Sequence, residues 1–313
     1  MQNKSTRFSL FPGIILFLCL AITGLFLFHS PGRHRQDTLP TIPGQRLEIS
    51  FITIGKGDAF VLKMPDNSYY MYDTGKKEDW EQIEAVLDGK QISSLKGIFL
   101  SHGHKDHAGN LKKLLNKMPV EKIYLSEKDT VSFDEDDLEE VLLQWGENKI
   151  VRLNGGETLE LGGATASIWI PERCDYENEN NNSLILHLSY GETSCLFTGD
   201  MEYEEEAAFL SSGFPCQATI LKLGHHGEKD ATSLALLQRV KPEYALITGN
   251  QKENPASVNK YKRDWMPAIS NLFIPKVNGW HGTFLWMEQK QSSRNMGRNN
   301  KCCKKNFNEI SIS

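Results

Sequence analysis

The stretch Ser101-His102-Gly103-His104-Lys105-Asp106-His107 has the pattern His-x-His-x-Asp-His and follows the apolar run Ile98-Phe99-Leu100. It places four potential metal ligands within six residues, including three of the nine histidines in the chain. Imidazole and carboxylate groups together suit zinc, iron or manganese. Because alternate residues at the end of a strand share a face, the first two histidines can approach one ion while the aspartate and the last histidine turn toward a second. We therefore interpret this loop as a site for two metal ions rather than as a solvated, histidine-rich turn.

This pattern also resembles the signature of the metallo-β-lactamase superfamily of metallohydrolases. The resemblance implies an α/β fold, a four-layer αββα sandwich with a dinuclear metal site at one edge of its sheets. Alternating apolar residues predict a half-buried strand at Leu47–Ile52, and apolar residues at helical spacing predict a helix at Trp80–Leu87. Further predicted strands fall into two groups that each have helices, as expected of one α/β domain.

The N-terminal segment suggests a membrane anchor. Phe8–Phe28 is 21 residues without a charge, and a helix of that length spans the roughly 30 Å of a bilayer's hydrocarbon. A cleaved signal peptide is the alternative, but its apolar region is usually about 7–15 residues long. We expect residues 1–28 to form an uncleaved single-pass transmembrane helix, whose orientation the basic residues at both ends leave open. Residues 29–46 are then a linker, residues 47–289 the hydrolase domain, and residues 290–313 a basic, disordered tail.

Charge is distributed unevenly along the chain. Residues 1–46 carry five Lys or Arg and one Asp, a net charge of +4, and residues 290–313 carry six Lys or Arg and one Glu, a net charge of +5. Because the whole chain has a net charge of −5, residues 47–289 have a net charge of −14. Such an acidic core is not an obvious polyanion binder, although divalent cations would offset part of its charge locally. The six cysteines show no zinc-finger or CxxC spacing and imply no disulfide framework.

A dinuclear hydrolase also needs a carboxylate that touches both ions and ligands that close the second site. Asp200 meets the first need just after the predicted strand Ser194–Phe197, although an aspartate there can instead cap the next helix. His225 or His226 meets the second need at another strand end, and we favour His225. The expected metal ligands are His102, His104, Asp106, His107, Asp200 and His225 (or His226).

Three other charged side chains near strand ends each have two interpretations. Asp73 is expected either to accept the free N–H of a metal-bound imidazole or to be a simple turn residue, and Asp58 has the same alternatives. Lys222 is expected either to neutralise a phosphate oxygen or to extend its stem along the end of a strand. Our catalytic candidates among these charged residues are Asp73, Asp106 and Lys222.

In this order, the segments are similar to the C-terminal extracellular hydrolase domain of ComEC-type competence proteins and their stand-alone relatives. The similarity rests on the central loop, the Asn-x-x-Ser segment at Asn180–Ser183 and the Leu-Lys-x-x-His-His-Gly segment at Leu221–Gly227, and it covers about residues 47–287. It implies an extracellular hydrolase domain attached to a membrane. Because the resemblance does not extend to a channel domain, it does not imply DNA uptake.

One position departs from the wider superfamily. Most dinuclear members have another histidine ligand between the central loop and the bridging aspartate, where this chain has only His187, whose neighbours indicate a sheet residue. The ComEC-like branch carries Asn180 and Ser183 near that place, and the resemblance implies that Asn180 binds or orients the metal-bound water. With one imidazole fewer, we expect the first site either to be weaker or to favour manganese over zinc, and β-lactam hydrolysis becomes an unexpected activity.

We therefore expect a membrane-anchored hydrolase that binds two divalent ions, Zn²⁺ or Mn²⁺, and cleaves a phosphodiester in nucleic acid or in a small phosphoester. A water shared by the ions is expected to lose a proton and attack phosphorus. One alternative is hydrolysis of another ester, a phosphocholine ester or a lactone, on the same scaffold. The other is a non-catalytic surface binding module. The sequence indicates no protein partner.

Overall fold

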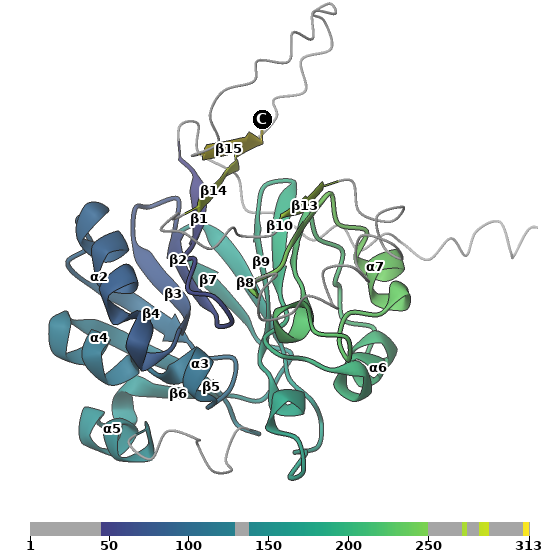
Figure 1. Cartoon of the computed structure of the whole chain (residues 1–313), viewed down its shortest axis with the longest axis horizontal. Helices are drawn as coiled ribbons and strands as arrows, with labels where there is room; N and C mark the ends of the chain where they lie inside the picture. The colour runs from purple at the N-terminus through teal and green to yellow at the C-terminus, as the bar shows by residue number, and fades with distance from the viewer. Residues whose placement is uncertain (1–44, 129–137, 250–270, 274–281, 288–308, 313) are drawn as a thin grey trace, which may run out of the picture. The chain divides into compact units, whose positions relative to one another are not determined.

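The computed structural model describes residues 45–128, 138–249, 271–273, 282–287 and 309–312 (Figure 1). The predicted anchor and all but the last two residues of the predicted linker lie outside these ranges. Among the described residues, no helix combines the length and the apolar character that a bilayer crossing needs.

Two β-sheets form the centre of the described fold. The strands of the first sheet are β1 (Leu47–Phe51), β2 (Ala59–Lys63), β3 (Tyr69–Thr74), β4 (Leu95–Phe99), β5 (Val120–Ser126), β6 (Ile150–Leu153), β14 (Gly282–Met287) and β15 (Glu309–Ile312). Those of the second are β7 (Thr158–Leu161), β8 (Ala164–Trp169), β9 (Ile185–Tyr190), β10 (Thr193–Phe197), β11 (Ile220–Lys222), β12 (Tyr244–Leu246) and β13 (Asn271–Phe273). Their spatial orders are β15-β14-β1-β2-β3-β4-β5-β6 and β13-β12-β11-β10-β9-β8-β7.

Helices cover the outer face of each sheet. They are α2 (Trp80–Gly89), α3 (Lys105–Ala108), α4 (Leu111–Lys117), α5 (Leu138–Trp145), α6 (Tyr203–Ser211) and α7 (Leu234–Val240), with short 3-10 turns η1 (Lys77–Asp79), η2 (Glu147–Lys149), η3 (Glu179–Asn182) and η4 (Gly224–Gly227). Figure 1 shows α2, α4 and α5 beside the first sheet and α6 and α7 beside the second. This arrangement confirms the predicted four-layer αββα sandwich.

Three apolar layers result from the alternation of side chains along the strands. On β2, Phe60 and Leu62 pack between the sheets, whereas Val61 packs on the helices of the first sheet. On β10, Phe197 packs between the sheets and Leu196 against α6 and α7. Because both faces of these strands are buried, they appear in the sequence as continuous apolar runs.

Aromatic contacts join the two sheets beneath the loop region. The Phe197 ring lies 4.8 Å from that of Tyr72 and 5.1 Å from that of Phe60, centroid to centroid. The Tyr72 hydroxyl donates to the Leu184 carbonyl oxygen across the interface at 2.9 Å. Such aromatic pairs add to the free energy of area burial and fix the sheets' relative position.

Strand direction brings the candidate residues to one edge. β3, β4, β5 and β6 are mutually parallel, as are β10, β11, β12 and β13. The loops after β3, β4, β10 and β11 therefore all leave from carboxyl ends, where ligand sites of α/β sheets lie. β2 runs antiparallel to β3, so Asp58, just before β2, reaches the same edge.

One described segment, Glu309–Ile312, lies within the tail for which we predict disorder. Glu309–Ile312 pairs in parallel with β14 as strand β15. The alternation of Ile310 and Ile312 with serines is a strand pattern, and the surrounding basic residues concealed it.

Candidate metal centre

His107 occupies the middle of the candidate site and is completely buried. Its Nδ1 lies 2.8 Å from Asp73 Oδ2, and its Nε2 lies 3.1 Å from Asp200 Oδ2. Asp73 is held in turn by the backbone N–H and the hydroxyl of Ser101, which donate to its two oxygens at 2.7 Å each. A carboxylate on Nδ1 keeps the proton there and directs the Nε2 lone pair into the site. Asp73 thus lies where its predicted orienting role requires.

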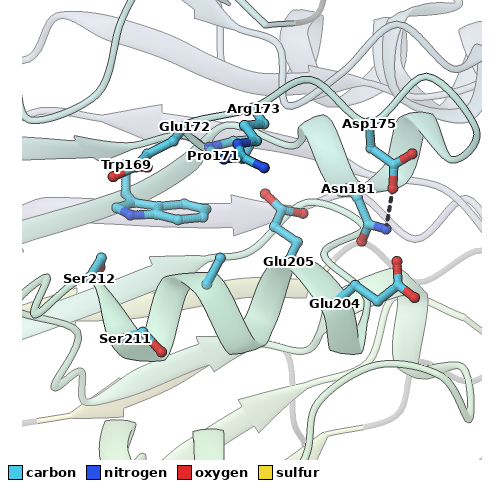
Figure 2. Close-up of a pocket in the computed structure, with 11 residues that line it drawn as sticks. Trp169, Pro171, Glu172, Arg173, Asp175, Asn181, Glu204, Glu205, Ser211 and Ser212 are labelled. Atoms are coloured by element: carbon cyan, nitrogen blue, oxygen red, sulfur yellow. Dashed lines mark hydrogen bonds between the residues drawn. The ribbon is translucent and has the colours of Figure 1, made fainter.

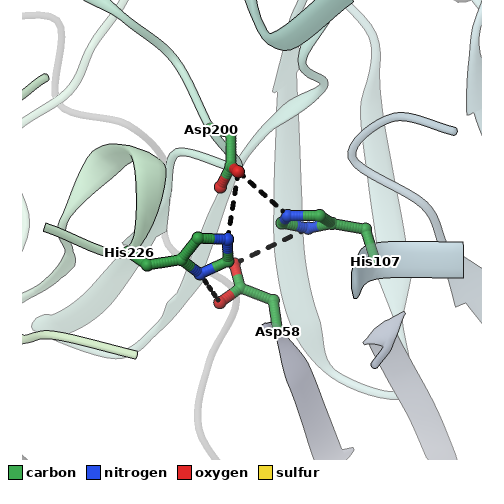
Figure 3. A group of neighbouring side chains, drawn as sticks. All are labelled: Asp58, His107, Asp200 and His226. Carbon is green, nitrogen blue, oxygen red and sulfur yellow. Dashed lines mark ion pairs between the residues drawn. The ribbon is translucent and has the colours of Figure 1, made fainter. Parts of the chain in front are cut away.

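Four buried side chains converge at this point, as Figure 3 shows: Asp58, His107, Asp200 and His226. One ligand atom from each lies within 4.8 Å of all the others. His226 Nε2 is 3.0 Å from Asp200 Oδ2, so two imidazole nitrogens approach the same carboxylate oxygen. Imidazole nitrogens around a shared carboxylate oxygen are a donor set that fits a divalent transition-metal ion.

The other residues of the central loop border this group. Asp106 Oδ2 is 3.5 Å from His226 Nε2, close enough to join the same ligand set. The His102 ring centroid is 4.2 Å from that of His107, and His102 Nε2 lies 2.9 Å from His104 Nδ1. The structure therefore brings all four predicted ligands of the loop together, although their metal coordination remains a prediction.

The His-His pair after β11 separates into two environments. His225 and His226 both have left-handed backbone, with φ of 45° and 51°, so their side chains diverge. His226 enters the cluster, with its Nδ1 3.0 Å from the Thr248 hydroxyl. His225, the ligand we favoured, lies instead with Glu202 at 3.4 Å and Asp230 at 3.1 Å. Of the two alternatives, the structure places His226 beside Asp200.

Lys222 is located differently from both of its predicted roles. It is 1% exposed, and its Nζ lies 2.5 Å from Asp58 Oδ2 and 3.4 Å from Asp200 Oδ1. The ammonium also donates to the Gly199 carbonyl oxygen at 2.6 Å. Its ammonium group is therefore paired with two aspartates inside the protein, an environment that neither predicted role assumed. Its positive charge compensates the negative charges of Asp58 and Asp200.

Charges in the cluster stabilise one another despite burial. Burial opposes ionisation of His226, but Asp200 and Asp58 raise the pKa of its imidazole to about 10. Burial likewise opposes ionisation of His107, yet Asp200 and Asp73 raise the pKa of that imidazole well above its ordinary value. Protons on the imidazoles thus balance the carboxylates in the metal-free protein, and a bound divalent cation would replace them in that role.

His102 behaves in the opposite way. Burial, reinforced by the charge of His107, lowers its pKa well below the ordinary value. A neutral imidazole is the form that binds metals, so His102 is suited to coordinate an ion.

Asn180 lies near the mouth of the site but faces an acidic partner. Its amide donates to Glu202 Oε1 at 2.7 Å, and its side-chain oxygen is buried without a hydrogen bond. Glu202 also accepts from the Asn178 amide at 2.8 Å, while Glu179 lies 3.2 Å from His104 Nε2. Sequence reasoning missed these two glutamates, together with Ser101 and Thr248, because no local pattern marks them.

Comparisons with known proteins agree with this geometry. Residues 52–248 match the family described as the metallo-beta-lactamase superfamily. ComE operon protein 3 of Bacillus subtilis is 27% identical over 224 residues, covering 65% of this chain and 28% of the relative. Recombination protein 2 of Haemophilus influenzae is 30% identical over 247 residues, covering 76% of this chain and 27% of the relative. The chain thus spans less than a third of the length of these relatives.

Solved structures with the same fold are more distant in sequence. The metallo-beta-lactamase fold protein YhfI from Bacillus subtilis superimposes with a TM-score of 0.52 at 14% identity, covering 76% of this chain and 100% of that chain. Tm1679, a metal-dependent hydrolase of the beta-lactamase superfamily, superimposes with a TM-score of 0.50 at 15% identity, covering 74% of this chain and 97% of that chain. Identities this low show the fold alone.

Proposed function

This chain belongs to the metallo-beta-lactamase superfamily, and we propose that it is a hydrolase that cleaves phosphodiesters with two divalent metal ions. Its fold and its buried histidine–carboxylate group are those of a metal-dependent hydrolase. The observation that carries the proposal is the approach of His107 Nε2 and His226 Nε2 to one oxygen of Asp200, at 3.1 and 3.0 Å.

Two sets of residues would hold the ions. His107, Asp200 and His226, with Asp106, would hold one, and His102 and His104, with Asp200, would hold the other. When bound, the ions would lower the pKa of coordinated water and stabilise the negative charge that develops at phosphorus. Zn²⁺ and Mn²⁺ both suit this donor set.

The protein's own residues position this centre and exclude bulk water from one side. Asp73 fixes the His107 ring, and Lys222 compensates Asp58 and Asp200 from within. The side chains of His104 and Asp106 remain 24% and 19% exposed, whereas those of His107 and Asp200 are 0% and 2% exposed. Substrate would therefore approach past His104 and Asp106.

The names of the relatives support a phosphodiester of nucleic acid as substrate. They are a ComE operon protein, a recombination protein and the competence protein ComA of Neisseria gonorrhoeae. The uncharged stretch Phe8–Phe28 supports the accompanying proposal that the hydrolase domain is attached to a membrane through its N-terminus. The proposal that the domain is extracellular rests on the resemblance to ComEC-type hydrolase domains alone.

The test is a substrate screen of the full chain with Zn²⁺ and with Mn²⁺. Single-stranded DNA, bis-p-nitrophenyl phosphate, a lactone and a β-lactam are compared, and we expect turnover of the phosphodiesters alone. The double variant D106A/H107A should lose turnover and keep its circular dichroism spectrum. D88A is the control, because the Asp88 side chain is 60% exposed on α2. Hydrolysis of only the lactone or the β-lactam, or full activity of the double variant, would contradict the proposal.

A further inference from the structure

A cavity of about 490 Å³ lies outside the metal centre, between α6 and the loop that follows β8. Trp169 and Asn181 form its inner wall with Glu205 (Figure 2). All three are buried, at 8%, 4% and 3% exposure. Small-molecule pockets in proteins typically measure about 300–1,000 Å³, so the cavity has room for a small ligand.

Glu205 is the unusual member of this wall. Figure 2 shows its carboxylate projecting from α6 into the space between Trp169 and Asn181. Neither of its oxygens has a hydrogen-bond partner. A buried carboxylate without partners is costly for a folded protein, and such an exception among buried polar groups calls for an explanation.

A second acceptor faces the same cavity. The Asn181 amide nitrogen donates to Asp175 Oδ2 at 2.9 Å, which leaves its oxygen buried and without a hydrogen bond. The Asn181 oxygen is an acceptor, and the Glu205 carboxyl offers only acceptors once it is ionised, so a ligand that carries N–H donors fits both.

The charge of the lining selects among such ligands. Besides Glu205, three acidic side chains and one guanidinium line the cavity: those of Glu172, Asp175, Glu204 and Arg173. An anionic ligand would meet repulsion from most of this lining, whereas a cation would be attracted. The indole of Trp169 adds a face to which cations bind favourably.

We propose that this cavity is a binding site for a primary organic ammonium ion, whose N–H groups donate to Glu205 and Asn181 while its carbon chain packs on Trp169. A quaternary ammonium ion lacks the N–H donors, and a neutral alcohol lacks the charge. The site is separate from the hydrolytic centre, so it can exist whether or not the chain cleaves phosphodiesters.

Binding at this site would change the protonation of Glu205. Burial raises the pKa of the Glu205 carboxyl well above its ordinary value, and the charges of Glu202, Asp175 and Asp200 raise it further. Glu204 on the same helix and Arg173 across the cavity are the other charged groups near it. An arriving ammonium ion favours the ionised carboxylate, so binding should release a proton from Glu205 to solvent.

The experiment is titration calorimetry of the full chain with n-butylammonium, in two buffers of different ionisation enthalpy. We expect binding accompanied by proton release, and weaker or no binding of 1-butanol and tetramethylammonium. E205Q should bind n-butylammonium at least about tenfold more weakly, on the order of 1.4 kcal/mol, and should release no proton.

The control is E206Q, a change of the adjacent residue on the same helix. Glu206 is equally buried, at 2% exposure, but it accepts from the Ser233 N–H at 2.9 Å and does not line the cavity. E206Q should bind as the unchanged protein does. The proposal is overturned if n-butylammonium does not bind at tens of millimolar, if 1-butanol or tetramethylammonium binds as tightly, or if E205Q binds like the unchanged chain.

Discussion

Replacing Lys222 with methionine would remove a buried cation and keep most of the side chain's volume. Burial works against the charge of Lys222, but Asp58 and Asp200 raise its pKa, so the side chain is an ammonium ion in the folded protein. Its Nζ lies 2.5 Å from Asp58 Oδ2 and 3.4 Å from Asp200 Oδ1, and the side chains of these aspartates are 0% and 2% exposed. Methionine supplies none of these interactions and leaves both carboxylates with one counter-charge fewer.

The expected cost is large for a single substitution. Breaking a buried ion pair by removing one partner costs about 3–5 kcal/mol, because the remaining charge is desolvated without compensation. A domain has roughly 5–15 kcal/mol of stability in total, so K222M should still fold with its urea midpoint strongly lowered. In D58N/K222M one carboxylate is neutralised, and at least half of the loss should be recovered.

Urea unfolding in the presence of a chelator measures these free energies. The matched control is K96M, since Lys96 forms an ion pair with Glu121 at 51% and 59% side-chain exposure, where about 0–1 kcal/mol is expected. Added Mn²⁺ should stabilise K222M more than the unchanged protein, because the ion supplies positive charge at Asp200. If K222M proved as stable as K96M while its KM for a phosphodiester rose, Lys222 would be a substrate contact and our account of it would be wrong.

Three further perturbations separate the roles of neighbouring residues. H226A should lower the metal content found by elemental analysis and H225A should not; equal losses would place both imidazoles at the ions. D73N should weaken metal affinity by about 10–100-fold, measured by competition with a chelator, and unchanged affinity would show that Asp73 does not orient His107. In the metal-free protein, Glu205 keeps its proton above pH 4.5, its ordinary value, where the unfolded chain has lost it. Its contribution to stability is therefore complete below that pH and declines as pH rises toward the folded pKa, by at most about 1.4 kcal/mol per unit. E205Q should flatten this decline in urea unfolding at a series of pH values, and an unchanged slope would contradict the raised pKa.

The resemblance of the central loop to the metallo-β-lactamase signature predicted the sandwich, and polar residues at the ends of apolar strands predicted the edge where the candidate site lies. Strands buried on both faces appear as apolar runs, and the strand predicted at Leu47–Ile52 corresponds to β1, Leu47–Phe51. The polar residues directly after such runs, His102 and Asp200 among them, had to meet at the carboxyl ends of the strands. That inference depends on strand direction and needs no knowledge of side-chain conformation.

The choice between His225 and His226 could not be made in the same way. Two adjacent identical side chains give no pattern, and their directions depend on backbone angles that the sequence does not reveal. Gly224 offers a partial clue, because a Cβ there would lie 2.5 Å from the Met201 carbonyl oxygen. The backbone before the pair therefore passes close to Met201, but this does not reveal which histidine enters the cluster, where His226 contacts Thr248.

The alternation of side chains along β11 also predicts the direction of its last residue, Lys222, which we did not use in the sequence analysis. Ile220, two positions earlier on β11, packs between the sheets, so Lys222 shares its face and points toward the same layer. A strand-end lysine usually reaches solvent, but here Asp58 occupies that edge from a segment far away in the sequence. Inward direction alone implies a buried ammonium ion, and a buried ammonium ion requires carboxylates around it. Asp58, Asp73, Asp106 and Asp200 all lie at this edge, so strand alternation combined with charge pairing predicts carboxylate partners for Lys222. The structure shows that these partners are Asp58 and Asp200.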